Sequence, residues 1–282
     1  MRLELKSLVK AAYLGLMRRV DRWWIPLQNA LWDRYARYFP RLFRHRIERA
    51  IDRGIAYFER IDEWEIDSLF VLRQFVDARF DPRLLMTDGA LKRYRESWKN
   101  PFLRLFDNGY DVKTANPTAP NTYVPPREMH QIMMDCVNAD RLELNEHFLP
   151  KLLAMEDEGD YGTTHILLGC VFLKRFGNMA HERLDAIIDQ TIPVIIRAQN
   201  PSRVSDIYSE RVAMLQWLGL HDCVRPAWIM RIARGQMRDG GWYWERPPFR
   251  TSSYQHPTCL AIAALLQYRQ KHFFFSPEII RP

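Results

Sequence analysis

Pairs of predicted helices recur along the second half of this chain, and their spacing limits the folds that it can adopt. Four apolar helices are expected to begin near residues 126, 162, 206 and 253, and an amphipathic helix follows each of the first three. The second and third apolar helices end alike, in Arg-Phe-Gly177 and Trp-Leu-Gly219. Helix pairs that recur every 35–46 residues or so are typical of all-α solenoids and of closed helical rings.

The third helix pair ends in a glycine turn and an aromatic run. Gln236 is followed by Asp239-Gly240-Gly241 and then by Trp242-Tyr243-Trp244. Glycine tolerates positive φ, and aspartate can accept hydrogen bonds from the turn, so a helix ends cleanly here. Gln236 stands close enough to Trp242 for its amide to bridge the helix end while the indole packs over it.

The stretch from Gln236 to Trp242 resembles the Gln…Gly-x-Trp motif (the QW motif) of triterpene cyclases and of the related protein prenyltransferases. The resemblance covers residues 228–268 closely, and the rest of the chain only through helix-pair spacing. It implies an α/α toroid, in which inner and outer helices alternate around a central cavity, and it implies a structural clamp as the role of the motif. An open stack of helix hairpins is the alternative architecture.

The chain departs from both families in the residues that carry their chemistry. The Asp-x-Asp-Asp acid motif of the cyclases is absent. The prenyltransferases bind zinc through Asp, Cys and His; here His256 and Cys259 stand one helical turn apart, but the matching Asp-x-Cys pair is missing. The resemblance therefore implies the scaffold more strongly than the activity.

The N-terminal part of the chain has a different charge balance. Residues 1–60 hold 14 Lys and Arg against 6 Asp and Glu, a balance of +8, so a formal net charge of +7 leaves −1 for the remainder. An acidic and then apolar run over 61–76 predicts a further helix, because carboxylates favour a helix N-terminus. A proline-rich connection from Asp107 to Pro126 suggests a boundary. We expect an N-terminal basic, aromatic helical layer at 1–110 and the helix-pair repeats at 111–282.

Basic and aromatic side chains alternate at helical spacing through residues 1–60, with Pro26 and Pro40 marking breaks or first turns. One interpretation is a pair of outer helices whose Trp and Phe pack inward while Arg stays in solvent. The other is a basic aromatic surface that binds an anionic membrane or an acidic partner. No nucleic-acid-binding module accompanies the charge, so no nucleic acid is expected.

The cysteines and the apolar runs indicate the cellular compartment in which the protein is expected. Four scattered cysteines without a Cys-x-x-Cys pair predict reduced thiols in a cytoplasmic protein, and two disulfides in an exported protein are the alternative. No apolar run reaches the roughly 18 residues of a membrane span. Lys10 interrupts the apolar segment Leu8 to Met17, which predicts an ordinary helix. We expect a cytoplasmic protein, with membrane association through residues 1–60 as the alternative.

Each apolar helix of the repeats carries an ionisable residue near its start: His130, His165, Glu210 and His256. If these helices form the inner ring, the four side chains project into one mouth of the cavity. Three imidazoles and a carboxylate suit zinc or iron, and two His with one carboxylate suit non-haem iron(II). Without a metal, the same groups can transfer protons. The alternative is that they are ordinary hydrogen-bonded residues at helix starts.

The candidate catalytic residues are therefore His165, Glu210, His256 and also Asp206, which lies one turn before Glu210 and equally fits a helix cap. The candidate metal ligands are His130, His165, Glu210 and His256. Aromatic side chains near the same mouth would wall an apolar pocket and stabilise a cationic intermediate; these candidates are Tyr161, Tyr208, Trp242, Trp244 and Tyr254. Packing within the core is the alternative role of these aromatic residues.

These features predict a small-molecule biosynthetic enzyme that acts on an apolar or isoprenoid-like substrate. Its reaction would be that of a metal-assisted lyase, cyclase or transferase, or would resemble that of a non-haem iron oxygenase. The alternatives are a non-catalytic helical-repeat binding or scaffold protein, and a peripheral membrane protein that uses its basic N-terminus. The chain has neither a Gly-x-Ser-x-Gly nucleophile motif nor a glycine-rich phosphate loop.

Overall fold

The computed structural model describes residues 2–76, 81–114, 117–118, 121–122, 124–125, 127–142, 144, 147–244 and 253–274, without the side chains of 2–18, 121, 122, 158, 160 and 274. This part of the chain is all-α, as predicted, apart from two strands of two residues each. These strands, β1 (Trp98–Lys99) and β2 (Asn121–Thr122), pair in parallel. Within the described ranges, no helix combines the length and the apolar character needed to cross a membrane.

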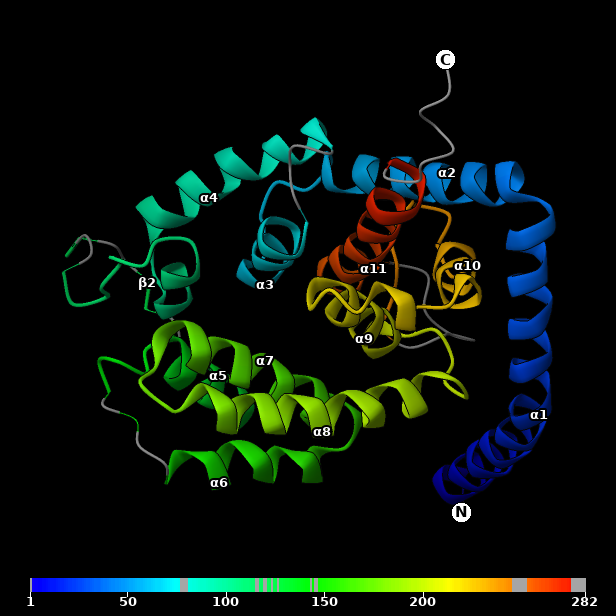
Figure 1. Cartoon of the computed structure of the whole chain (residues 1–282), viewed down its shortest axis with the longest axis horizontal. Coiled ribbons are helices and arrows are strands. Elements are labelled where there is room, and N and C mark those ends of the chain that lie inside the picture. The colour runs from blue at the N-terminus through cyan, green and yellow to red at the C-terminus, as the bar shows by residue number, and fades with distance from the viewer. Residues whose placement is uncertain are drawn as a thin grey trace.

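Two long helices form one edge and the top of the molecule as drawn in Figure 1: α1 (Arg2–Tyr38) and α2 (Pro40–Phe58). Pro40 occupies the first turn of α2, where a missing N–H costs nothing. Pro26, in contrast, lies inside α1, so the predicted break there is wrong. The helix continues because its inner face, with Ile25 and Asn29 buried, packs against the rest of the protein.

Short elements follow α2. The run predicted as one helix over 61–76 forms α3 (Ile66–Phe70) and a π-helical turn (Val71–Phe75). A 3-10 helix (Pro82–Leu85) leads into α4 (Met86–Ser97), and a second 3-10 helix spans Pro101–Leu105. The expected irregular connection from Asp107 to Pro126 is described only in part, and that part contains turns and β2.

The remaining helices correspond to the predicted pairs. They are α5 (Glu128–Val137), α6 (Phe148–Leu153) with a 3-10 turn (Ala154–Glu158), α7 (Asp160–Phe176), α8 (His181–Gln199), α9 (Asp206–Trp217), α10 (Pro226–Arg234) and α11 (Gln255–Arg269). A 3-10 turn (His221–Cys223) precedes α10, and a π-helical turn (Gln270–Phe274) follows α11.

Helix α11 lies at the centre of the packing. It is buried continuously from Pro257 to Arg269 and contacts α2, α3, α9 and α10. Its neighbour α9 is buried from Asp206 to Gln216, and α7 packs between α5 and α8. Figure 1 shows α2 and α4 along the top and α6 and α8 along the bottom, with α3, α9 and α11 between them. One apolar core therefore includes residues from both sides of residue 110.

Candidate functional site

A cavity of about 550 Å³ lies among α3, α5, α7, α9 and α11. Most of its wall is apolar, with contributions from Ile66, Phe70, Val71, Phe75, Phe102, Leu105, Met129, Met133, Leu168, Phe172, Met214 and Leu260. Its polar residues come from the first two turns of helices or from the residues just before them. All four ionisable residues that the repeat pattern singled out line this one cavity: His130, His165, Glu210 and His256.

Glu210 and His165 form a close pair within the cavity. Nδ1 of His165 lies 3.8 Å from Oε1 of Glu210 and 2.9 Å from the carbonyl oxygen of Tyr161. Because a carbonyl only accepts, Nδ1 carries the hydrogen, and the lone pair of the neutral ring is on Nε2. The imidazole therefore has one nitrogen fixed by its own helix and the other suited to accept a proton.

The carboxyl group of Glu210 is deeply buried. The residue is 6 % exposed, and its Oε2 has no hydrogen-bond partner among the described residues. Burial raises the pKa of Glu210 to about 7, although the Thr164 hydroxyl and the charge of His256 partly offset the effect. At neutral pH this carboxyl group therefore exists in both protonated and ionised forms, as a proton-transfer group requires.

Asp206 does not cap α9, although its position in the sequence fitted a helix cap. Ser205 caps α9, because its hydroxyl accepts a hydrogen bond from the Tyr208 N–H at 3.3 Å. The Asp206 carboxylate instead accepts a hydrogen bond from the hydroxyl of Tyr161, whose ring lines the cavity. Burial raises the pKa of Asp206, and the bond from Tyr161 lowers it in part. Asp206 thus fixes Tyr161, and the Tyr161 carbonyl in turn holds His165.

His256 is positioned by contacts at the start of α11. Its ring stacks on Trp244, with ring centroids 5.1 Å apart and an interplanar angle of 17°. The preceding residue, Gln255, links α11 to the start of α3. Its Oε1 accepts from the Glu65 N–H at 3.0 Å, and its Nε2 donates to the Glu63 carbonyl at 2.6 Å. These bonds bring α3 against the cavity.

His130 completes the set on α5. Burial lowers the pKa of His130, and the nearby charge of Asp67 opposes the effect. The Nδ1 atoms of His130 and His256 are both buried without a hydrogen-bond partner among the described residues. Both imidazoles therefore line the cavity with one ring nitrogen that the described residues leave unsatisfied.

The four predicted metal ligands are only partly grouped within the cavity wall. Among the residues that the structure describes, no group of three or more His, Cys, Asp or Glu side chains is placed to hold a metal ion. Zinc or iron held by His130, His165, Glu210 and His256 therefore stays a prediction. Of the four predicted ligands, His165 and Glu210 form a pair, and the imidazoles of His130 and His256 lie separately in the cavity wall.

The aromatic candidates divide into two groups. Tyr161 and Trp244 line the cavity, but Tyr208, Trp242 and Tyr254 are not part of its wall. Tyr208 is fully buried beneath the Arg231 guanidinium, 5.0 Å from its ring centroid. Trp242 is 2 % exposed, and Tyr254 pairs with it through a backbone bond of 2.9 Å between the Tyr254 N–H and the Trp242 carbonyl. Tyr208 and Trp242 are therefore core residues, whereas Tyr254 is exposed just before α11.

The turn from Gln236 to Trp242 joins three helices. The Gln236 amide donates to the Gly240 carbonyl at 2.7 Å and to the Ala50 carbonyl of α2 at 2.8 Å. The Trp242 indole N–H donates to the Ile232 carbonyl of α10 at 2.8 Å. Its backbone N–H donates to the Thr258 hydroxyl of α11 at 2.9 Å. The turn therefore ties α10 to α2 and fixes the start of α11, from which His256 projects.

Asp239 in the same turn is a structural residue, as its sequence context suggested. Its Oδ1 accepts from the Gly241 N–H at 3.2 Å and from the Ser253 hydroxyl at 2.6 Å. Burial alone would raise the pKa of Asp239, but the bonds from Ser253 and Gly241 lower it overall. A carboxylate held ionised in this way is suited to closing a turn.

Three polar residues of the cavity were not among the predicted candidates: Glu65 and Asp67 at α3, and Arg127 just before α5. Burial raises the pKa of Glu65, and His256 opposes the effect. Glu65 and Asp67 repeat the pattern of an ionisable residue at the start of an apolar helix, which is the signal that found the other four. Glu65 and Asp67 were not predicted because residues 61–76 were assigned to the N-terminal layer, and the pattern was sought only in the helix-pair repeats.

Similarity to known proteins would be a second source of information about this cavity. The resemblance to the QW motif covers one short stretch, and the role of that stretch is structural. A fold hosts many functions, so the chemistry of the site is the sounder basis for assigning one. Comparisons of the chain with protein-family models, with curated proteins and with solved structures found no match.

Proposed function

We propose that this protein is an enzyme that acts on a small, largely apolar molecule by general acid–base catalysis, with Glu210 and His165 as the proton-transferring pair. The observation that carries the proposal is the buried Glu210 carboxyl group, 3.8 Å from His165 in an apolar cavity and with its pKa raised to about 7. Acid and base catalysts work best when their pKa lies near the working pH.

The cavity indicates the substrate class. Its volume of about 550 Å³ lies within the range of roughly 300–1,000 Å³ that is usual for small-molecule sites. The apolar wall suits a hydrocarbon body such as an isoprenoid, and the ionisable residues provide the few polar contacts. Tyr161 and Trp244 present aromatic faces that would stabilise a cationic intermediate.

In the proposed reaction, the enzyme donates one proton to the substrate and takes one back, so no proton is consumed. Protonated Glu210 donates to a carbon–carbon double bond or to a leaving group, which creates a carbocation or its equivalent. Nε2 of His165 then removes a proton from a neighbouring carbon, and the resulting imidazolium gives its Nδ1 proton to the Glu210 carboxylate, whose Oε1 lies 3.8 Å away. A tautomer change of the neutral ring, from Nε2–H to Nδ1–H, then restores His165. Isomerisation, elimination and cyclisation all follow this scheme. Asp206 is a positioning residue, because it acts through Tyr161.

We propose in addition that the helices form an α/α toroid, with α3, α5, α7, α9 and α11 as the inner ring. Residues within the first two turns of these five helices border the same cavity, which supports this arrangement. Helices α2, α4, α6, α8 and α10 would form the outer ring. The bonds of Gln236 and Trp242, which join α10 to α2 and α11, match the role that the QW motif has in such rings.

The same cavity favours an enzyme over the scaffold alternative. A scaffold protein would be expected to have a filled centre and an apolar groove on its surface. This protein instead has a cavity that is lined by ionisable side chains from α3, α5, α7, α9 and α11.

Proton exchange with solvent tests the proposal before the natural substrate is known. A panel of isoprenoid alcohols, diphosphates and hydrocarbons is incubated with the protein in D₂O, and mass spectrometry measures deuterium in the recovered compounds. We expect incorporation with the native protein and a loss of at least about 100-fold in Glu210→Gln and His165→Gln, as is usual for removing a general acid or base. The exposed Glu156→Gln variant is the matched control.

The contrary result is equally definite. If compounds that bind in the cavity, as shown by competition and by co-crystal structures, are recovered without deuterium, acid–base catalysis at this site is wrong. Equal incorporation by the native protein and by Glu210→Gln would exclude Glu210 as the acid.

A further inference from the structure

Helix α1 has an inner face that is tied to the body of the protein. Ile25 and Asn29 are buried there. The Asp33 carboxylate accepts from the Arg225 guanidinium at 2.5 Å and from the Ala227 N–H of α10 at 2.9 Å. One turn before Ile25, Asp21 pairs with Arg203. These contacts fix which side of α1 faces outward.

The outward side of α1 is unusually apolar. Val20, Trp24, Leu27, Leu31 and Tyr38 recur every three to seven residues and form one stripe along the helix. All of them are exposed: Leu27 and Leu31 are each 51 % exposed and Tyr38 is 68 % exposed. Trp23 is 82 % exposed beside the stripe, and Phe39 and Leu42 extend it onto α2. We call these eight residues the outer α1 face.

This concentration of exposed apolar side chains is not a general property of the protein surface. The structure describes fourteen exposed large apolar residues, and eight of them belong to the outer α1 face. Single exposed apolar residues are normal on a soluble protein, but a contiguous patch marks an interaction site. The stripe from Val20 to Tyr38 extends over roughly 27 Å at 1.5 Å per residue.

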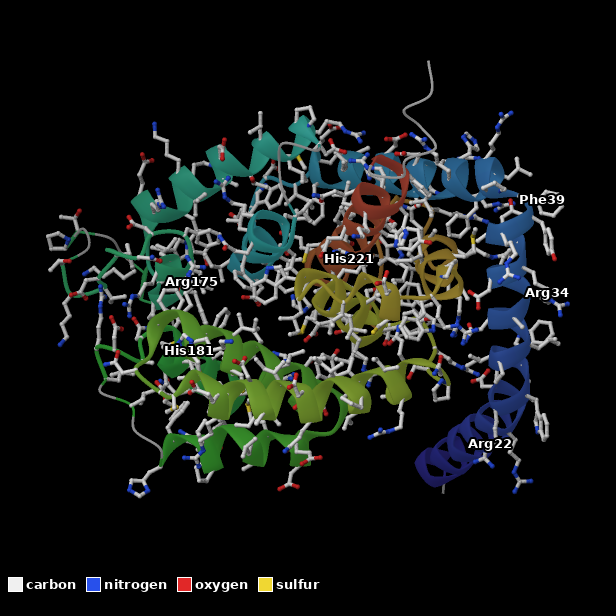
Figure 2. All side chains as sticks on the ribbon, in the orientation of Figure 1. Arg22, Arg34, Phe39, Arg175, His181 and His221 are labelled. Atoms are coloured by element: carbon white, nitrogen blue, oxygen red, sulfur yellow. The ribbon has the colours of Figure 1, made fainter. Side chains whose placement is uncertain are left out.

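Exposed arginines lie along the same segment of the chain. Arg19, Arg22, Arg34, Arg37 and Arg41 are all exposed. Figure 2 shows Arg34 of α1, and Phe39 just after it, on the outer edge of the protein, with their side chains directed away from its body.

No carboxylate of the same segment offsets these charges on the outer side. Residues 19–47 contain two acidic residues, Asp21 and Asp33, and both pair with arginines of the inner side. The outer α1 face is therefore both apolar and cationic.

We propose that the outer α1 face binds the surface of an anionic lipid bilayer. The helix would lie in the plane of the membrane, with Trp23, Trp24, Leu27 and Leu31 at the boundary between headgroups and acyl chains. The arginines would bind lipid phosphates and anionic headgroups. This inference is independent of the proposed function, because the cavity is lined by other helices.

The chemistry of the face favours a bilayer over two other occupants. In a dimer that pairs this face with itself, the arginines of both copies would meet, and like charges would oppose association. A nucleic acid would use the arginines and the tryptophans, but it would leave the aliphatic centre at Leu27 and Leu31 without a partner, since bases stack on aromatic rings. A bilayer satisfies the charged and the aliphatic parts together.

Vesicle co-sedimentation of the full chain tests the proposal. The probes are vesicles of phosphatidylcholine alone and vesicles that contain 30 % phosphatidylserine. We expect binding to the anionic vesicles that falls at least tenfold in Trp23→Ala/Leu27→Ala and in Arg34→Glu/Arg37→Glu. High salt should weaken binding of the native protein. All substituted positions are exposed, so circular dichroism and thermal unfolding should match those of the native protein.

Matched controls lie on other surfaces. Leu85→Ala/Leu153→Ala removes exposed apolar side chains elsewhere, and Lys92→Glu/Arg93→Glu reverses two exposed charges of α4. Both should keep native vesicle binding. The proposal is overturned if anionic and neutral vesicles bind equally, or if the variants of the outer α1 face bind like the native protein.

Sedimentation velocity without vesicles gives a further decisive result. We expect the native protein and the face variants to sediment identically. If the native protein is instead a dimer that Trp23→Ala/Leu27→Ala dissociates, the face joins two copies of this chain, and the bilayer proposal is wrong. Turnover of any compound found by deuterium exchange should be unchanged in these variants, so failure of this proposal is distinguishable from failure of the proposed function.

Discussion

Replacement of Glu210 by Gln should change how the stability of the protein depends on pH. The substitution keeps the shape of the side chain and removes its charge. Burial raises the pKa of Glu210 from 4.5 to about 7, a shift of about 2.5 units, and one unit corresponds to about 1.4 kcal/mol. The folded protein therefore favours the protonated carboxyl group by about 3 kcal/mol relative to the unfolded chain.

The direction of the effect follows from the raised pKa. The stabilisation by the proton is complete below pH 4.5 and is lost as the pH rises through about 7. The free energy of unfolding of the native protein, minus that of Glu210→Gln, should therefore fall by about 3 kcal/mol between these limits. The groups that face Glu210, namely His165, His256, Asp206 and Arg211, are present in both proteins, so the difference isolates this carboxyl group.

Urea unfolding, followed by tryptophan fluorescence at half-unit pH steps, measures this difference. The Glu156→Gln variant is the control. Because Glu156 is exposed, the stability difference between this variant and the native protein should not fall by about 3 kcal/mol over the same pH range. A carboxyl ¹³C NMR titration of the native protein assigns the pKa to Glu210 directly. A stability difference between the native protein and Glu210→Gln that stays constant from pH 4.5 to 8 would refute the argument, and the proposed catalytic acid with it.

Two matched pairs of substitutions test the packing that positions the cavity. Trp242→Ala should cost about 3–5 kcal/mol, because a buried indole is lost, whereas Trp23→Ala should stay within about 0.5 kcal/mol. Gly240→Ala should cost at least about 2 kcal/mol, because φ is 95° and the new Cβ would stand 2.3 Å from the Arg53 carbonyl oxygen. Gly219→Ala should cost about 1 kcal/mol, because φ is 81° but no atom lies within 4 Å. Urea unfolding at neutral pH measures all four, and equal losses within either pair would contradict the assigned contacts.

The helix pairs were predictable because their signals are local. Apolar residues at helical spacing, together with Gly177 and Gly219 at helix ends, place the helices within a few residues of their observed bounds. Pro26 shows the limit of this reasoning. Its effect on a helix depends on tertiary packing of the inner face of α1, and the sequence of α1 alone does not reveal that contact.

The cavity residues were predictable for a geometric reason. Side chains at equivalent positions of neighbouring helices face the same way, so one register brought His130, His165, Glu210 and His256 to one cavity. That reasoning does not tell which aromatic residues face the cavity and which face a neighbouring helix. Tyr208 stands two residues before the cavity-lining Glu210 in α9, yet its ring is buried under Arg231, a partner that is distant in sequence.

The central place of α11 has a consequence for synthesis of the protein. The helix contacts α2, α3 and α9, and its last residue, Arg269, pairs with Glu48 and Asp81. Because translation proceeds from the N-terminus at about 5–20 residues per second, α2 stays without this partner for roughly 10–40 s. The apolar face of α2 that α11 covers is exposed throughout that interval, so nascent chains should depend on chaperones that shield it until α11 emerges.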